Sequence, residues 1–117
     1  MLTSRIGLAL GGGGTRGIAH LGVLHHFHEI DLQIDVIAGT SAGAIVGALY
    51  AFDVPLKEIE EDLRNLKPAH FSSLRMPKLG LFENDQLREM LEKRLPKNAQ
   101  IQDAHIPLAI KATDIET

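Results

Sequence analysis

The sequence predicts an α/β fold in which helices cover both faces of a mainly parallel sheet, a three-layer α/β/α arrangement. The first two of three short apolar runs are followed directly by glycine, longer segments between the runs have helical periodicity, and the two kinds alternate along 117 residues. Strands that alternate with helices of this length form βαβ units, whose right-handed crossovers cover a parallel sheet. A chain of this length fits one domain.

The first half of the chain predicts two strands and two helices. The strands are the apolar runs Ile6 to Leu10 and Ile34 to Ala38. Between them, the segment 15–30 repeats apolar residues in steps of three, which indicates a helix with Thr15 as its N-cap. Its apolar face is predicted to hold Ile18, Leu21, Leu24, Phe27 and Ile30. Ala42 to Phe52 is apolar nearly all round, so we expect a helix buried in the core.

The second half predicts two amphipathic helices and a third strand. Asp53-Val54-Pro55 ends the buried helix and starts the first of them, in which the inward residues are Leu56, Ile59, Leu63 and Leu66. A long connection follows from Lys67 to Glu83. Asn84 is predicted to cap the second helix, which Pro96 stops, with an apolar stripe of Leu87, Met90, Leu91 and Leu95. Ile106 to Ala112 reads as the third strand.

Composition excludes several classes of function. A net charge of -3, from 12 basic and 15 acidic residues, does not favour a nucleic-acid partner. The absence of cysteine excludes thiol catalysis, disulfides and cysteine metal sites. Met1 to Leu10 lacks the features of a secretory signal, and no run reaches the roughly 18 apolar residues of a membrane span. We therefore expect a soluble, cytoplasmic chain, peripheral to a membrane at most, and the sequence leaves its oligomeric state open.

The connection 67–82 mixes large apolar residues with Lys67, Arg75 and Lys78. This composition suits a cover over an acyl-binding cleft or a transient contact with an anionic lipid surface. A loop packed on its own domain is the simpler interpretation, and we prefer it.

Two glycine-rich turns carry the functional signal. They are Gly11-Gly12-Gly13-Gly14-Thr15-Arg16-Gly17 and Gly39-Thr40-Ser41-Ala42-Gly43. Each follows a predicted strand and opens a predicted helix, so both turns should lie at the same edge of the sheet. Open parallel sheets place their active sites at that edge.

The second turn has the spacing of a nucleophile elbow with Ser41 at its centre. Such a serine sits in a strained backbone conformation, and its neighbours must be small for strand and helix to pass closely. Gly39, Ala42 and Gly43 meet that demand, and Gly39 and Gly43 are our supporting residues. The alternative is a plain helix start with Ser41 or Thr40 as the cap, and this motif alone leaves the two about even.

The first turn offers consecutive backbone N–H groups without side chains. Gly12, Gly13 and Gly14 are the candidate oxyanion donors, because glycine tolerates the positive φ that such a row of donors needs. The positive end of the following helix reinforces them. Arg16 either adds positive charge to this loop or braces it by bonding to carbonyls. Acyl transfer by a serine is the reaction that the two turns indicate together.

Two other classes of function remain open on the residues alone. Gly12-x-Gly14-x-x-Gly17 satisfies the dinucleotide fingerprint, but Asp35 precedes the apolar part of the second strand, the wrong end for binding a ribose. A P-loop fits less well, since Ile18 and Ala19 stand where lysine and a hydroxyl are needed. A non-catalytic scaffold that keeps the glycines for close packing is the third class.

The run from Gly11 to Leu24 followed by Gly39-Thr40-Ser41-Ala42-Gly43 closely resembles the patatin-like phospholipase family. The resemblance covers the whole chain and is strongest in the first 50 residues. It implies lipid acyl hydrolysis by a serine–aspartate dyad without histidine. We expect no cofactor and no metal. Ser41 maps onto the nucleophile, and Gly12, Gly13 and Gly14 map onto the oxyanion loop. Phospholipids, lysophospholipids or simple esters are then the expected substrates.

The chain departs from the family at the base. The family's aspartate lies in an Asp-Gly-Gly or Asp-Gly-Ala turn, and no aspartate here precedes glycine. We therefore expect residues 1–117 to be the N-terminal portion of a patatin-like domain, truncated before the catalytic aspartate and catalytically silent by itself. A histidine base at His105 is a weaker alternative that predicts a Ser41–His105 hydrogen bond. His20, His25, His26 and His28 are expected to be satisfied or to face solvent.

Overall fold

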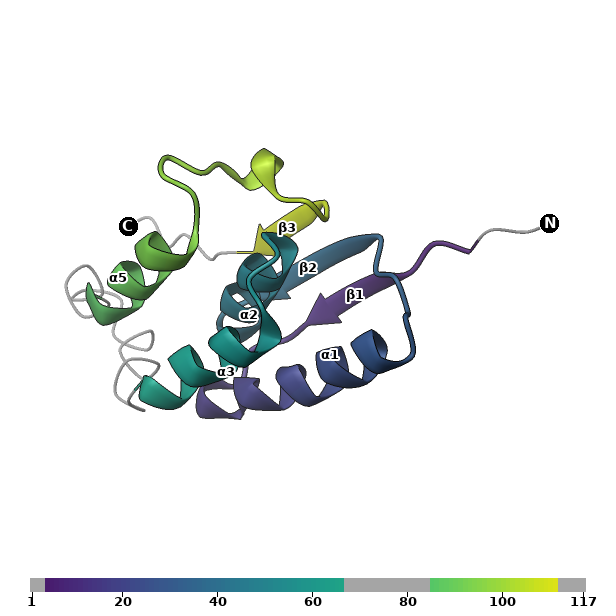
Figure 1. Cartoon of the computed structure of the whole chain (residues 1–117), viewed down its shortest axis with the longest axis horizontal. Helices are drawn as coiled ribbons and strands as arrows, with labels where there is room; N and C mark the ends of the chain where they lie inside the picture. Colours follow the sequence, from purple (N-terminus) through teal and green to yellow (C-terminus); the bar gives the residue numbers. More distant parts are fainter. Residues whose placement is uncertain (1–3, 67–84, 112–117) are drawn as a thin grey trace, which may run out of the picture.

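A three-stranded parallel sheet organises the chain. The computed structural model describes residues 4–66 and 85–111. The strands β1 (Gly7–Leu10), β2 (Val36–Thr40) and β3 (Leu108–Lys111) lie side by side in the order β1-β2-β3 and point the same way (Figure 1). In the ladders Ala38 pairs with Ala9 on one side and with Ala109 on the other.

Helices fill the connections between the strands. The 3-10 helix η1 (Gly14–Ile18) leads into α1 (Ala19–Glu29) between β1 and β2. After β2 come α2 (Ala42–Ala51), α3 (Leu56–Asn65), α5 (Asp85–Arg94) and the 3-10 turn η4 (Ile101–Asp103). None of these helices in the described part of the chain is both long and apolar enough to cross a bilayer.

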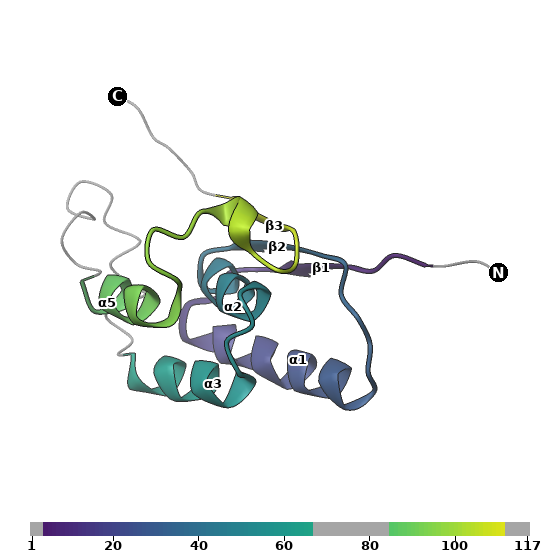
Figure 2. The same ribbon diagram turned by 45° about the horizontal axis from the view of Figure 1, so that its top comes forward.

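The described helices gather on one face of the sheet. Figure 2 shows the strands on one side of the molecule and α1, α2 and α3 on the other. Leu10 and Ile37 are buried on the α2 side, whereas the register-paired Ala9, Ala38 and Ala109 are exposed on the opposite face. Because each new strand is added in the same direction, right-handed crossovers must all run over the same face.

The structure confirms the α/β class and the parallel sheet. The second helical layer of the expected three-layer arrangement is not found among the residues that the structure describes. It would require a strand added on the other side of β1, since reversing the direction of strand addition moves a right-handed crossover to the other face.

One hydrophobic core lies between the sheet and the helices. Its fully buried side chains are Leu21 and Leu24 of α1, Ile37 of β2, Val46 and Leu49 of α2, and Ile59 of α3. The helix α2 contributes most of its length to this core, as its apolar sequence predicts. Its central place fixes the position of its first residue, which directly follows Ser41.

Two expectations for the first helix are wrong. The helical segment begins with η1, whose N-cap is Gly13, so Thr15 is not the capping residue. Ile18 and Ile30 are 36% and 55% exposed instead of facing the core. A repeat in steps of three drifts by about 60° per step around an α-helix, so only its middle members can share one face. These are Leu21, Leu24 and the half-buried Phe27.

The second half of the chain follows the predicted pattern. Ile59 and Leu63 of α3 are buried, and Leu56 and Leu66 are partly buried against the core. The helix α5 ends at Arg94, shortly before Pro96, and its partly buried apolar residues pack on the same core. The predicted connection 67–83 and the predicted cap at Asn84 lie outside the described residues, as do the expectations for lipid contact that rest on them.

Candidate functional site

Ser41 occupies the turn between β2 and α2 in a conformation that non-glycine residues rarely adopt. Its backbone has φ 52° and ψ −127°, and it is the N-cap residue of α2. Holding a side chain in such a conformation costs on the order of 1–3 kcal/mol, which the surrounding packing must offset. The strained turn that the motif predicts is therefore present at Ser41.

The Ser41 side chain does not cap the helix. It makes no capping hydrogen bond to the first turn of α2, and the residue is exposed. The backbone carbonyl of Ser41, by contrast, accepts hydrogen bonds from Ala44 (2.9 Å) and Ile45 (3.3 Å). The alternative of an ordinary helix start capped by the Ser41 side chain is thus wrong, because the hydroxyl makes no hydrogen bond to the first turn of α2.

Close packing of the second turn depends on glycine. A Cβ placed on Gly43 would lie 2.1 Å from the carbonyl oxygen of Leu10. A Cβ on Gly39 would lie 2.6 Å from the Gly43 carbonyl oxygen and 2.8 Å from Ala44 Cα. All of these atoms belong to the backbone, which cannot give way as a flexible side chain would. The first turn of α2 therefore sits directly against the ends of β1 and β2.

The glycine loop after β1 lies against Ser41. A Cβ placed on Gly12 would lie 3.2 Å from Ser41 Cβ and 3.7 Å from Ser41 Oγ. At the other end of the loop, a Cβ on Gly17 would lie 2.6 Å from Ala42 Cβ. The two glycine-rich turns thus meet at the carboxyl edge of the sheet, although they are far apart in the sequence.

Two glycines of this loop adopt conformations that side chains disfavour. Gly13 has φ 141° and Gly14 has φ 59°. The loop exposes Gly11, Gly12 and Gly13 to solvent, while Gly14 is half-buried. The loop is therefore open to approach beside the Ser41 hydroxyl.

His20 braces this loop, which confirms the expectation of a satisfied histidine and adds the partner that the sequence did not identify. Its Nε2 hydrogen-bonds the Gly11 carbonyl oxygen at 2.8 Å, which requires the tautomer that carries the proton on Nε2. Arg16 was the residue expected to brace the loop or charge it. Its backbone N–H donates to the Gly13 carbonyl at 3.0 Å, and its side chain is exposed. The available signal was the position of His20, one helical turn after the glycines.

Among the described residues, no hydrogen bond joins the Ser41 side chain to a histidine or a carboxylate. His105 binds Asp53 through Nδ1, and its backbone N–H donates to Ala51 at the far end of α2. Ten residues of helix, about 15 Å, separate that end from Ser41. The predicted Ser41–His105 hydrogen bond is absent, so the alternative of a histidine base at position 105 is wrong.

The described aspartates that make polar contacts also bind groups other than Ser41. Asp35 accepts a hydrogen bond from the Ile6 N–H at 2.7 Å, Asp62 pairs with Arg94, and Asp103 accepts from the Gln100 N–H at 2.9 Å. Asp35 lies just before β2, at the amino edge of the sheet. A ribose-binding acid would be needed at the opposite edge, so the dinucleotide interpretation lacks its acidic residue.

A hollow of about 830 Å³ lies at the amino edge of the sheet, far from Ser41. It is lined by polar groups that include His28, Asp31, Asp35 and Tyr50. Burial raises the pKa of Tyr50, and the nearby Asp53 adds to the effect, so its phenol stays neutral over the physiological range. No three histidine or acidic side chains of residues 4–66 and 85–111 converge to hold a metal ion.

Comparison with known proteins places these features in a family. The family model described as patatin-like phospholipase matches residues 8–116. Over 54 residues the chain is 57% identical to "Lysophospholipase NTE1" of Saccharomyces cerevisiae, a match that covers 46% of this chain and 3% of that protein. The same name is carried by matches in Coccidioides immitis (58% over 48 residues, 41% of this chain) and Eremothecium gossypii (59% over 51 residues, 44% of this chain). The matches span about 3% of the length of each of these relatives.

Proposed function

Because this chain belongs to the patatin-like phospholipase family, we propose that it carries the nucleophile and the oxyanion loop of a lipid acyl hydrolase. The observation that supports this proposal most directly is the meeting of Ser41 and the glycine loop. The hydroxyl stands on a strained turn, and Gly12 lies against it without a side chain between them.

The proposed reaction begins with attack of Ser41 Oγ on the carbonyl carbon of an ester. A base takes the hydroxyl proton, the C–O bond of the ester breaks, and the alcohol leaves with a proton. Water then cleaves the acyl-enzyme and restores the serine. The family resemblance assigns the base to an aspartate in an Asp-Gly-Gly or Asp-Gly-Ala turn, which these 117 residues do not contain.

The charge that develops on the carbonyl oxygen needs donors in the same place. The N–H groups of Gly12, Gly13 and Gly14 are the proposed donors, and the left-handed conformations of Gly13 and Gly14 allow successive amides to turn toward one point. The N-terminus of α2 adds its positive end beside Ser41. Both features would stabilise a negative oxygen beside Ser41.

An alkyl fluorophosphonate tests the nucleophile, because it labels activated serines covalently. We expect a form of the protein that contains the family's Asp-Gly-Gly or Asp-Gly-Ala turn to be labelled on the peptide containing Ser41, and Ser41→Ala to lose the label completely. Ser4→Ala is the matched control, since Ser4 is an exposed serine just before β1, at the opposite edge of the sheet. Labelling that survives in Ser41→Ala, or that maps to another serine, would contradict the proposal.

The same assay separates the nucleophile from the base. The 117-residue chain alone is expected to react slowly, and a form extended through an Asp-Gly-Gly or Asp-Gly-Ala turn is expected to react fast. General-base assistance contributes typically 10²–10⁴-fold in rate. Equal rates for the two forms would show that the base lies within residues 1–117.

A further inference from the structure

An open apolar groove begins one helical turn beyond Ser41. Its volume is about 230 Å³, and every side chain that lines it except Gln100 is apolar. The helix α2 contributes Ala44, Ile45, Ala48 and Phe52, and β3 contributes Leu108 and Ile110. The remaining wall comes from α5 and the segment that joins it to β3. No charged group lines the groove, which suits it to a neutral alkyl chain and not to a polar headgroup.

Two contacts place one end of the groove beside the proposed nucleophile. The N–H of Ala44 donates to the Ser41 carbonyl at 2.9 Å. Ile110 pairs in the sheet with Gly39, two residues before Ser41, and its side chain is 41% exposed. The groove therefore opens at the same sheet edge as the Ser41 hydroxyl.

The small residues of α2 create the space. Ala44 and Ala48 are four residues apart, so they share one face of the helix, and Phe52 follows on the same face after another four. From Ala44 to Phe52 the helix runs about 12 Å, which gives the groove the length of a chain of several methylenes. A larger side chain at position 48 would fill the middle of this path.

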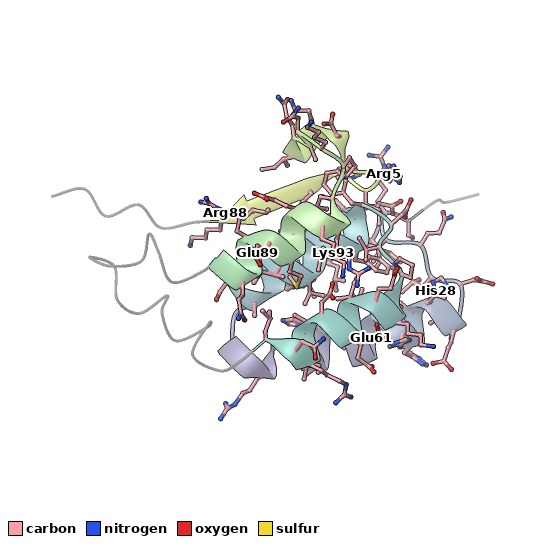
Figure 3. The ribbon with its side chains drawn as sticks, turned by 60° about the vertical axis from the view of Figure 1, so that its left-hand side comes forward. Arg5, His28, Glu61, Arg88, Glu89 and Lys93 are labelled. Carbon is pink, nitrogen blue, oxygen red and sulfur yellow. The ribbon has the colours of Figure 1, made fainter. Side chains whose placement is uncertain are left out.

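The charged side chains of α5, on the opposite wall, lie outside the groove. The helix α5 exposes Arg88, Glu89 and Lys93, which are labelled in Figure 3 together with Glu61 of α3. Leu91 of α5 and Leu95, the residue that directly follows the helix, line the groove. The helix α5 thus has a charged face toward solvent and an apolar face toward the groove.

We propose that this groove holds the acyl chain of the ester that Ser41 attacks, with Ala48 midway along it and Phe52 at its far end limiting the chain length. The inference rests on the function proposed above and adds to it the residues that select the substrate. Affinity then rises with each methylene that leaves water, up to the length of the groove. Ala48 and Phe52 touch no reacting atom, so they determine specificity and are not catalytic.

Lauric acid binding tests the groove without any need for catalysis. The background is Ser41→Ala in the same extended form, which is expected not to turn over an ester, and binding is measured by calorimetry. We expect Ala48→Leu to weaken laurate binding about tenfold, because its added carbons occupy space needed by about two methylenes. Ala19→Leu is the matched control, since it makes the same change at an exposed position of α1. Circular dichroism and urea unfolding establish that each variant is folded.

The chain-length profile of hydrolysis gives the second readout. With Ser41 intact, Ala48→Leu should lower kcat/KM for p-nitrophenyl laurate about tenfold and leave p-nitrophenyl butyrate unchanged, whereas Phe52→Ala should favour longer chains. A folded Ser41→Ala protein that binds no laurate, or that binds it equally with and without Ala48→Leu, overturns the groove proposal. If laurate binds as expected but neither ester is cleaved in a Ser41-dependent way, the groove stands and the proposed hydrolase function fails.

Discussion

At the scale of single residues, the strained backbone of Ser41 lowers the stability of the fold and fixes the position of the hydroxyl. Its φ of 52° and ψ of −127° belong to a region that glycine enters without strain and serine does not. The hydroxyl gains no capping hydrogen bond in return. Strain without a local structural benefit is typical of functional sites, and here it holds the hydroxyl at the edge where the glycine loop lies.

Substitutions at position 41 should separate strain from chemistry. We expect Ser41→Gly to be more stable than Ser41→Ala by about 1 kcal/mol, because only glycine relieves the positive φ. Urea unfolding measures the difference, and both variants should lose fluorophosphonate labelling. The control is Ala44→Gly, three residues later in α2, where the same exchange should destabilise by about 1 kcal/mol. If Ser41→Gly and Ser41→Ala unfold at the same urea concentration, the turn is not strained.

At the scale of elements, an ion-pair cluster ties α5 to α3. Arg94 donates to Asp62 through Nε (2.7 Å) and Nη2 (3.0 Å), and to Glu58 through Nη1 (2.9 Å). The side chains of Arg94 and Asp62 are only 16% and 12% exposed. The hydrogen bonds to Asp62 raise the pKa of Arg94 above its usual value, with burial opposing them, so the guanidinium stays charged at any pH at which the protein is handled.

Removing this guanidinium should loosen α5. We expect Arg94→Met to destabilise the protein by about 2 kcal/mol, because it leaves the Asp62 carboxylate largely buried without its partner. Because the Arg94 pKa is raised above its ordinary value, the guanidinium stays charged at both pH 7 and pH 9, and the effect should be the same at the two pH values. The control is Arg64→Met, which removes an exposed pair with Glu60 at 3.5 Å and should cost less than about 0.5 kcal/mol. Equal effects of the two substitutions in urea unfolding would show that the cluster does not hold α5.

At the scale of the whole molecule, β2 is the centre of the described structure. It pairs with β1 on one side and β3 on the other, and α2 packs across it. One face of the sheet carries the core, and the other exposes Ala9, Ala38 and Ala109. Both glycine-rich turns leave the sheet at its carboxyl edge, one after β1 and one after β2. Because β1 pairs with β2, the position of both turns depends on this central strand.

Hydrogen exchange should reveal the same hierarchy. We expect the amides of β2, for example Ile37, whose N–H donates to the Pro107 carbonyl at 2.9 Å, to exchange most slowly. The amides of β1 and β3 should exchange faster, because each of these strands is paired on one side among the described residues. Mass spectrometry after deuteration resolves the three strands as separate peptides. Protection of β3 equal to that of β2 would contradict this ranking.

The sequence by itself determined the α/β class, the order of the main strands and helices, and the family. These depend on local patterns: apolar runs, helical periodicity and glycine at positions where backbone must approach backbone. The boundaries and faces of the first helix were less predictable, because a repeat in steps of three fits a stripe for only a few turns before it rotates away.

Tertiary structure alone decided which groups meet. It placed Gly12 against Ser41 and the Gly11 carbonyl within hydrogen-bond distance of His20. It also paired His105 with Asp53 at the far end of α2 and formed the groove between α2, α5 and β3. It also placed the described helices on one face of the sheet, through a strand order that no local pattern encodes. The physical reason is that periodicity and propensity act within a few residues, whereas contacts between distant segments are set by the packing of the whole core.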